Sequence, residues 1–285
     1  MHSELNRRVK PARILTIAGS DSGGGAGIQA DLKTCTALGC YGMTAITAIT
    51  AQNTLGVRAI HEVPAPCVRD QIAAVFEDIG VDAVKTGMLS SEAIIEAVAD
   101  GLRRYKSAPV VVDPVMISKS GAALLKQDAV EALKRLLLPL SAVLSPNIPE
   151  AEVLSGIRIE TAEEITRALH ILHGMGPEFV LLKGGHLQAE TAVDYLFDGD
   201  TITTFTAERL QTVHTHGTGC TYSAAIACFL GLGESVPRAV HLAKNYLTCA
   251  ILHGMHLGLG SGTGPLHHGW NLETDINTGK IKQDS

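Results

Sequence analysis

Aromatic residues are scarce in this sequence, and it also lacks a basic excess, a long apolar run and paired cysteines. Phe, Trp and Tyr make up 4% of the 285 residues, which argues against a stacking surface for single-stranded nucleic acid. The formal net charge of −6 provides no general basic footprint for DNA, RNA or an acidic lipid surface. We therefore expect neither a nucleic-acid partner nor a membrane partner.

Targeting and redox features point to the cytoplasm. No apolar run approaches the roughly 18 residues that a membrane-spanning helix requires. Residues 1–10 are polar and lack the apolar segment of a secretory signal. The six cysteines form no Cys-x-x-Cys pair and show no zinc spacing, so most of them are expected to be small buried hydrophobes in a reducing compartment.

Hydrophobic residues, at 46% of the chain, supply a large core, and their order predicts how it is built. Short apolar runs rich in β-branched residues alternate with helical patterns along the whole chain, without a linker. This order predicts an α/β fold with a mainly parallel sheet. We expect a flexible arm over residues 1–11, one domain over 12–270 and a tail over 271–285.

The individual elements follow from periodicity and from the turn residues between them. Ser90 or Ser91 is the expected cap of the third helix. Strands are predicted over residues 13–18, 43–50, 83–84, 109–113, 142–145 and 179–182, with a hairpin over 193–205 that turns at Asp198-Gly199. Helices are predicted over residues 26–38, 67–79, 91–105, 127–137, 162–175, 218–230 and 237–253.

Polar residues and a glycine collect at one end of the predicted strands. In an open parallel sheet, ligands bind at the carboxyl ends of the strands, and scattered surface residues would not all choose that edge. The residues at or just beyond these ends are Gly19, Gln52, Lys85, Asp113, Asn147 and Lys183.

A glycine-rich turn at residues 214–222 precedes the apolar helical run that starts near Thr218. Gly217 and Gly219 let the backbone turn sharply, and the first amides of the helix have no partner within it. Such a terminus is suited to binding phosphate or the charge that develops on it. The alternative is an ordinary loop-to-helix turn with a buried cysteine.

Asp113, Asn147 and Glu150 are candidates for a magnesium site, because Mg²⁺ prefers oxygen ligands and keeps several waters. Asp113 could instead satisfy loop amides, and the Asn-x-x-Glu spacing could simply cap the following helix. Lys183 is either an exposed lysine at a strand end or a point charge for a transferred phosphate.

Two common nucleotide motifs are missing. The glycines of residues 19–27 do not have the Gly-x-Gly-x-x-Gly spacing of a dinucleotide site, and there is no Gly-x-x-x-x-Gly-Lys-Ser/Thr. An NAD-dependent oxidoreductase is therefore disfavoured, and any nucleotide is expected to bind through residues 216–220.

The sequence resembles the hydroxymethylpyrimidine and phosphomethylpyrimidine kinases of thiamine biosynthesis. Residues 16–31 read like the opening signature of that family, and further blocks follow in the family's order as far as His268. These blocks are Thr50-Ala-Gln-Asn-Thr54, Lys85-Thr-Gly-Met-Leu89, Asp113-Pro-Val-Met116 with Lys119-Ser-Gly121, Ser145-Pro-Asn-Ile-Pro-Glu150, Leu182-Lys-Gly-Gly-His186 and His216-Gly-Thr-Gly-Cys-Thr221.

The resemblance implies a ribokinase-like three-layer α/β/α sandwich, a homodimer, and Mg²⁺-ATP as phosphate donor. It also implies two successive phosphorylations, first of 4-amino-5-hydroxymethyl-2-methylpyrimidine and then of its monophosphate. The resemblance also assigns roles to residues of this chain: some would bind the substrate, some ATP or the metal, and some would form an anion hole. They are Gln52, Gly19, Met88, Val115 and the supporting Asp31 for the pyrimidine; Lys183, Thr218 and Asn147 for ATP; Asp113 and Glu150 for the metal; and Gly217, Gly219 and Cys220 for the anion hole.

Cys220 occupies the position of the aspartate base of ribokinase-like sugar kinases. We hypothesise that the helix N-terminus lowers the pKa of this thiol, so that it takes the hydroxyl proton. The alternative is that transfer depends on positioning and electrostatics, with the proton leaving late.

Two other functions of the same fold stay open. One is a pyridoxal kinase, although relatives of that kind have a second cysteine where this chain has Ser118. The other is a regulator that binds the pyrimidine without phosphorylating it. Residues 117–122 are the expected lid, because a kinase must keep water from the transferred group.

Overall fold

One sheet organises the chain, and its strands follow the order β3-β2-β1-β4-β5-β6-β7-β8-β9. The computed structural model describes residues 10–106, 108–116, 124, 127–184 and 191–272. Within them the strands are β1 Arg13–Asp21, β2 Tyr41–Asn53, β3 Gly56–Glu62, β4 Ala83–Thr86, β5 Val110–Val112, β6 Val143–Leu144, β7 Phe179–Lys183, β8 Thr191–Phe197 and β9 Ile202–Glu208.

The central strands β2, β1, β4, β5, β6 and β7 are parallel, whereas β3 and the β8–β9 hairpin add antiparallel pairs at the two edges. The chain passes from β1 to β2 on one side and later returns to pair β4 with the other side of β1. The strand order therefore reverses between β1 and β4, and this is where sheets of this type bind ligands.

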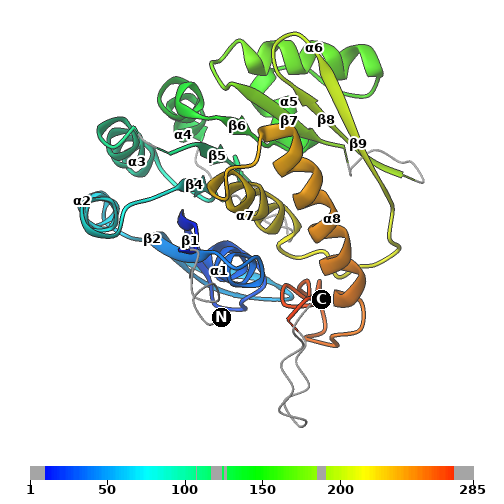
Figure 1. Ribbon diagram of the computed structural model, residues 1–285, viewed down its shortest axis with the longest axis horizontal. Helices are drawn as coiled ribbons and strands as arrows, with labels where there is room; N and C mark the ends of the chain where they lie inside the picture. Colours follow the sequence, from blue (N-terminus) through cyan, green and yellow to red (C-terminus); the bar gives the residue numbers. More distant parts are fainter. Residues whose placement is uncertain (1–9, 107, 117–123, 125–126, 185–190, 273–285) are drawn as a thin grey trace, which may run out of the picture.

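Helices cover both faces of the sheet, so the predicted three-layer α/β/α sandwich is confirmed (Figure 1). One face carries α1 Gly27–Ala37, α7 Thr218–Gly231 and α8 Val236–Gly254. The other carries α2 Ala65–Ala74, α3 Glu92–Arg104, α4 Gln127–Ala132, α5 Ile148–Ser155 and α6 Ala162–His173, with short π-helical turns at Val75–Ile79 and Leu133–Leu137 and a 3₁₀ turn at Leu138–Leu140.

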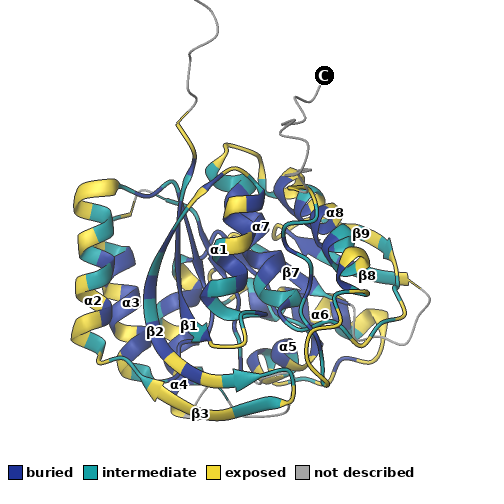
Figure 2. Cartoon of the chain, turned by 90° about the horizontal axis from the view of Figure 1, so that it is seen from below, coloured by how far each residue is buried: buried dark blue, intermediate teal, exposed yellow. Residues whose placement is uncertain are grey.

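Each central strand sends alternate side chains into two separate cores, because successive residues of a strand point to opposite faces. Val110 and Val112 pack beneath α2–α6, whereas Val111 between them packs beneath α1, α7 and α8. The buried colour of β1 and α7 in Figure 2 reflects this two-sided covering. Strands enclosed on both faces read as continuous apolar runs, which is why the sequence revealed them.

Some boundaries differ from the sequence predictions. β1 continues to Asp21 through an irregularity between Ala18 and Ser20. The edge strand β3 was not predicted, because its largely exposed residues show no buried alternation. Ser91 is the residue before α3, but its hydroxyl makes no capping hydrogen bond and instead contacts Glu62.

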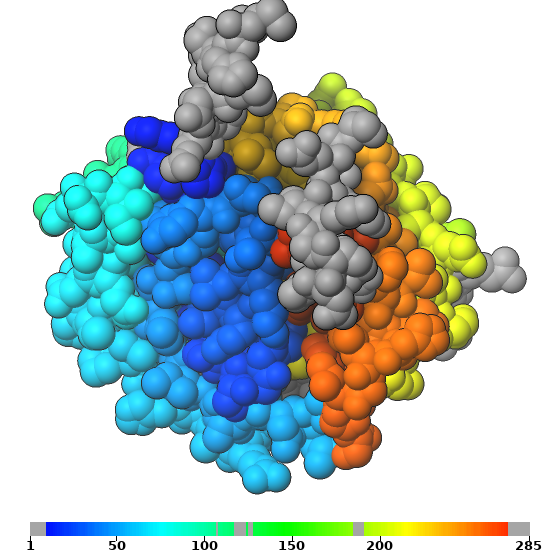
Figure 3. Space-filling model, turned by 60° about the horizontal axis from the view of Figure 1, so that its bottom comes forward, coloured from blue at the N-terminus to red at the C-terminus, as the bar shows by residue number. Residues whose placement is uncertain are grey.

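The C-terminal segment returns to the N-terminal third of the molecule. Figure 3 shows the C-terminal region, in orange, beside the N-terminal region, in blue. The Thr263 amide donates to the carbonyl of Thr54, and Asn271 donates to the carbonyl of Ala37 at the end of α1. None of the helices in the described ranges has the length and apolar character needed to cross a bilayer.

Candidate active site

A cavity of about 860 Å³ opens at the carboxyl ends of the strands, within the size range of small-ligand sites. It collects residues that are far apart in the sequence, including Asp113, Lys183 and Cys220. The predicted site residues that line it are Gly19, Gln52, Met88, Asp113, Val115, Asn147, Glu150, Lys183, Gly217, Thr218, Gly219 and Cys220.

The N-terminus of α7 faces this cavity. It can lie there because two glycine loops, residues 19–27 and 214–222, pack directly against each other. Gly217 precedes the helix with φ of 84°, a left-handed conformation that favours glycine. A Cβ at Gly217 would overlap the carbonyl oxygen of Gly25, and a Cβ at Gly25 would overlap the ring of His216. The backbone amides of Gly219 and Cys220 follow directly in the first turn of α7, where amides have no helical partner.

A cation and a carboxylate lie beside this helix end. Lys183 Nζ is 2.9 Å from Asp113 Oδ1, and Ser223 Oγ donates to Asp113 Oδ2 at 3.3 Å. A Cβ placed on Gly219 would lie 3.6 Å from both Lys183 Nζ and Asp113 Oδ2. Burial by itself lowers the pKa of Lys183, but the carboxylates of Asp113 and Glu150 more than offset this, so the amine stays charged.

Asn147 and Glu150 form the capping box of α5. The Asn147 side chain accepts from the Glu150 amide at 2.9 Å, and Glu150 Oε2 accepts from the Asn147 amide at 2.9 Å. The capping alternative is thus confirmed, and it leaves the second carboxylate oxygen for other partners. Burial, followed by the nearby Asp113, raises the pKa of Glu150 to about 7, although Lys183 lowers it in part.

The oxygen donors of Asp113 and Glu150 fit a hard divalent cation such as Mg²⁺. Two carboxylates share this corner of the cavity with Lys183 as the nearby positive charge. A cation between or beside them would offset both the burial and the repulsion from Asp113 that raise the pKa of Glu150. Among the described residues no cluster of three or more His, Cys, Asp or Glu is arranged for a metal.

Lys85 and Asp31 form a buried ion pair at the cavity wall. Lys85 Nζ is 2.8 Å from Asp31 Oδ2, and Thr16 Oγ1 donates to the same oxygen at 2.5 Å. Burial raises the pKa of Asp31 and lowers that of Lys85, but the mutual attraction keeps Lys85 charged. Lys85 touches the cavity, whereas Asp31 does not line it; Asp31 reaches it only through Lys85.

Cys220 differs from the sequence hypothesis. The helix N-terminus was expected to lower the pKa of this thiol. Instead, burial raises the pKa of Cys220 to about 11, although the Lys85 charge lowers it in part. The thiol is therefore neutral near pH 7, because desolvation outweighs the helix terminus and the neighbouring cation.

One side of the cavity is formed by the ends of β1 and β2. Gly19 lies against the methyl end of Met88, leaving no room for a Cβ. The Gln52 amide donates to Ser22 Oγ at 2.8 Å, and that hydroxyl donates back to the Gln52 carbonyl at 2.7 Å. These bonds fix the backbone of Gln52 and direct its side chain to the cavity.

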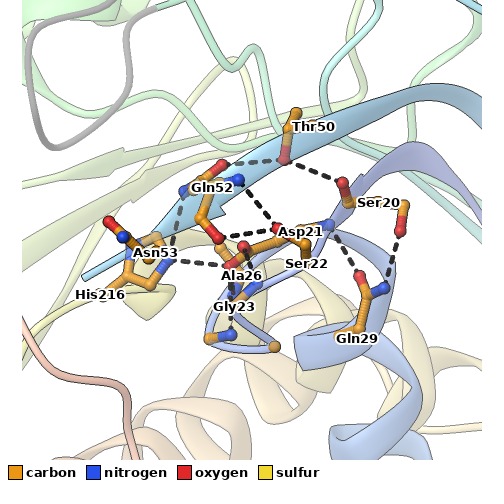
Figure 4. A network of polar contacts seen from close by, with 12 residues as sticks. Ser20, Asp21, Ser22, Gly23, Ala26, Gln29, Thr50, Gln52, Asn53 and His216 are labelled. Carbon is orange, nitrogen blue, oxygen red and sulfur yellow. Dashed lines mark hydrogen bonds and ion pairs between the residues drawn. The ribbon is translucent and has the colours of Figure 1, made fainter. Parts of the chain in front are cut away.

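Sequence reasoning missed two residues, Asp21 and His216. Figure 4 shows them bridging the two glycine loops next to Gln52. His216 Nε2 lies 2.9 Å from Asp21 Oδ2, and both side chains line the cavity. An Asp that opens a glycine run was the available signal, since such residues bind nearby backbone amides. Ser118 and the expected lid at residues 117–122 lie outside the described residues.

Comparison with known proteins decides the family. A family model described as phosphomethylpyrimidine kinase matches residues 21–267. The chain belongs to this family. A hydroxymethylpyrimidine/phosphomethylpyrimidine kinase from Streptomyces coelicolor is 51% identical over 264 residues, covering 93% of this chain and 97% of the relative. The family resemblance inferred from the sequence blocks is therefore confirmed.

Two further relatives differ from the Streptomyces coelicolor protein, one in its length and one in the substrate that its name gives. The Geobacter sulfurreducens thiamine biosynthesis bifunctional protein is 52% identical over 93% of this chain, which spans only 54% of that longer protein. The ADP complex of Bacillus subtilis pyridoxal kinase is 39% identical with a TM-score of 0.84, covering 93% of this chain and 100% of that one. The ribokinase-like fold is thus shared by kinases that act on different rings.

Proposed function

We propose that this chain phosphorylates 4-amino-5-hydroxymethyl-2-methylpyrimidine with ATP, and then phosphorylates the resulting monophosphate to the diphosphate, in thiamine biosynthesis. The observation that carries this proposal is the convergence of Lys183, Asp113 and the N-terminus of α7 in the cavity that also holds Gln52. The 51% identity to a relative of that name over nearly the whole chain supports the same substrates.

In the first step the substrate hydroxyl oxygen attacks the γ-phosphorus of ATP, ADP leaves, and the hydroxyl proton is released. The Gly219 and Cys220 amides and the Lys183 ammonium provide positive charge where negative charge develops on the transferred group. Thr218 and Asn147 extend this surface along the ATP phosphates. Transfer of this kind depends mainly on positioning and electrostatics.

Mg²⁺ fits the Asp113 and Glu150 oxygens, and when bound it neutralises charge on the ATP phosphates. The ammonium of Lys183, 2.9 Å from Asp113, would supply further positive charge for the phosphates. Because Cys220 is a neutral thiol, we assign its contribution to the backbone amide rather than to proton abstraction by sulfur. The late-proton alternative is therefore the mechanism we favour.

Phosphorus NMR tests the assignment directly. Mg²⁺-ATP is incubated with the protein and, in separate tubes, with the pyrimidine alcohol, its monophosphate and pyridoxal. New monophosphate and diphosphate signals in the first two tubes are expected. Binding of the pyrimidine without any product would instead identify a regulator.

Pyridoxal is the second candidate substrate, favoured by the TM-score of 0.84 to the Bacillus subtilis pyridoxal kinase. The higher identity to the pyrimidine kinase, 51% against 39%, places it second. A pyridoxal phosphate signal stronger than the pyrimidine signals would reverse this order.

A homodimer in the cytoplasm is also part of the proposal. Ile49, Leu55 and Ile60 on the β2–β3 hairpin expose large apolar side chains, as expected of a surface that meets a partner. Light scattering with size-exclusion chromatography measures the mass, and a mass near 60 kDa is expected from a chain of 30.0 kDa. The free cysteines suit a reducing compartment.

A further inference from the structure

His216 and Asp21 form a polar bridge between the two glycine loops, and the bridge reaches Gln52 (Figure 4). His216 Nε2 lies 2.9 Å from Asp21 Oδ2 and 3.3 Å from Gln52 Nε2. The imidazole thus stands between a carboxylate and the carboxamide that faces the substrate cavity. Asp21 also accepts three backbone amides, those of Gly23 at 2.8 Å, Gly25 at 3.1 Å and Ala26 at 2.9 Å.

These contacts determine which atom carries the imidazole proton. Burial raises the pKa of Asp21, but the bonds from His216 and the backbone amides outweigh burial and lower the pKa overall. Asp21 is therefore an ionised carboxylate, which only accepts hydrogen bonds. It follows that His216 Nε2 is protonated and donates to Asp21, as a carboxylate partner fixes the tautomer of a histidine.

A protonated Nε2 conflicts with an amide nitrogen of Gln52 beside it, because both groups are donors. A second conflict lies at the other end of the same carboxamide. The single proton of Thr50 Oγ1 faces two acceptors, the Ser20 carbonyl at 3.0 Å and Gln52 Oε1 at 3.2 Å.

Turning the Gln52 carboxamide by half a turn removes both conflicts. Its oxygen can then share, as the second and more distant acceptor, the one Nε2 proton that His216 donates to Asp21, and its nitrogen donates to Thr50, whose own proton remains on the Ser20 carbonyl. The oxygen and nitrogen of a carboxamide have nearly the same shape, so the hydrogen-bond partners decide the orientation. The contact between two donors and the competition for the Thr50 proton are then both relieved.

We propose that His216, held by Asp21, turns the Gln52 oxygen towards the imidazole and thereby selects ring substrates that present an amino donor there over substrates that present an acceptor oxygen. His216 is thus a positioning residue, and this inference rests on the proposed function. The aminopyrimidine alcohol has such a donor beside its hydroxymethyl group. Pyridoxal has a carbonyl oxygen at the equivalent position.

A matched pair of variants isolates the donor. His216→Gln keeps an N–H group at about the distance of Nε2 from the main chain, whereas His216→Met has similar length and no donor. We expect His216→Met to raise KM for the aminopyrimidine alcohol roughly tenfold, with kcat and the KM for ATP within about twofold of wild type. His216→Gln should restore most of the affinity.

The selectivity ratio separates positioning from a general structural role. In His216→Met, the ratio of kcat/KM for the aminopyrimidine alcohol to that for pyridoxal should fall roughly tenfold. The control is His214→Met, which changes a neighbouring loop histidine whose Nδ1 accepts from the Gly264 amide, and it should leave the ratio unchanged. Equal losses for both substrates, or identical behaviour of the Gln and Met variants, would overturn the proposal.

A measurement without turnover separates this inference from the proposed function. Nitrogen-15 NMR of histidine-labelled wild-type protein should assign a proton to Nε2 of His216. A proton on Nδ1 alone would disprove the bridge. If the wild type phosphorylates no pyrimidine but Nε2 is protonated, the proposed function fails and the bridge stands, while its role in substrate selection is refuted.

Discussion

Lys85 and Asp31 are joined at 2.8 Å in an ion pair that has no solvent-exposed side-chain surface at either end. Their elements, β4 and α1, flank the point where the strand order reverses. Such a pair contributes little net stability when intact, because burying two charges is costly. It does hold the wall of the cavity in one arrangement, since neither charge has water as an alternative partner.

Removing one partner of this pair should strongly destabilise the fold. Lys85→Met leaves Asp31 buried without its cation, and such a loss costs about 3–5 kcal/mol. Urea denaturation followed by circular dichroism measures the free energy of unfolding. The double variant Lys85→Met/Asp31→Leu should recover most of the loss, because no lone charge remains.

The matched control is Arg104→Met, which breaks an ion pair with Glu77 in which both side chains are largely exposed. Exposed pairs contribute little, so this variant should unfold close to the wild-type midpoint. A Lys85→Met protein as stable as Arg104→Met would show that the buried pair is not required.

The sequence was sufficient to predict most of the sheet and the edge at which the cavity opens, because both depend on local patterns. Val110–Val112 is apolar throughout, and the Asp113 that follows it lines the cavity. The hairpin about Asp198-Gly199 also exists, since Asp198 binds the amides of Asp200 and Thr201. Turn chemistry and strand burial can thus be predicted from each segment of the sequence by itself.

Contacts between distant segments could not be predicted from the sequence. Asp21 and His216 are separated by 195 residues, and neither has a local motif that names its partner. The pKa of Cys220 was wrongly predicted for a related reason: the burial that raises it is set by tertiary packing. The pairing of Asp31 with Lys85, which lies between it and the cavity, likewise depends on tertiary packing.

Lys183 should be essential for turnover. Lys183→Met removes the positive charge beside Gly219 and Asp113, and loss of one such stabilising group costs roughly 100- to 1,000-fold in kcat. The measurement is ADP release with saturating pyrimidine alcohol. Lys134→Met, on the distant η2 turn of residues 133–137, is the control and should retain wild-type kcat. A Lys183→Met enzyme with a kcat near wild type would remove this residue from the mechanism.

Gly217→Ala and Gly156→Ala compare two glycines with similar positive φ, 84° and 73°. A Cβ at Gly217 meets the carbonyl of Gly25, whereas nothing lies within 4 Å of one at Gly156. Gly156→Ala should cost only about 1 kcal/mol of stability. Gly217→Ala should displace the anion-binding turn and lower kcat/KM by at least about tenfold. Equal activity of the two variants would contradict contact between the glycine loops.

His268 should make folding sensitive to acid. Burial lowers its pKa from 6.5 to about 4, so between these values the unfolded chain binds more protons than the folded one. Stability therefore rises with pH through this window, and the difference amounts to about 3 kcal/mol. His268→Gln should lose correspondingly less stability than wild type between pH 7 and pH 4 in urea titrations. His61→Gln, at an exposed site on β3, should follow the wild-type curve.

Cys220→Ala distinguishes the two roles considered for this residue. A general base contributes roughly 100- to 10,000-fold, whereas a neutral thiol that only fills space beside the helix N-terminus contributes far less. Because burial raises the pKa of Cys220 to about 11, we expect kcat of Cys220→Ala to fall by less than about tenfold, since the alanine amide still lies in the first turn of α7. The measurement is single-turnover phosphorylation of the pyrimidine alcohol, followed from pH 6 to pH 9. A loss above 100-fold, with a wild-type rate that climbs with pH and a flat profile in the variant, would restore the thiol as the base.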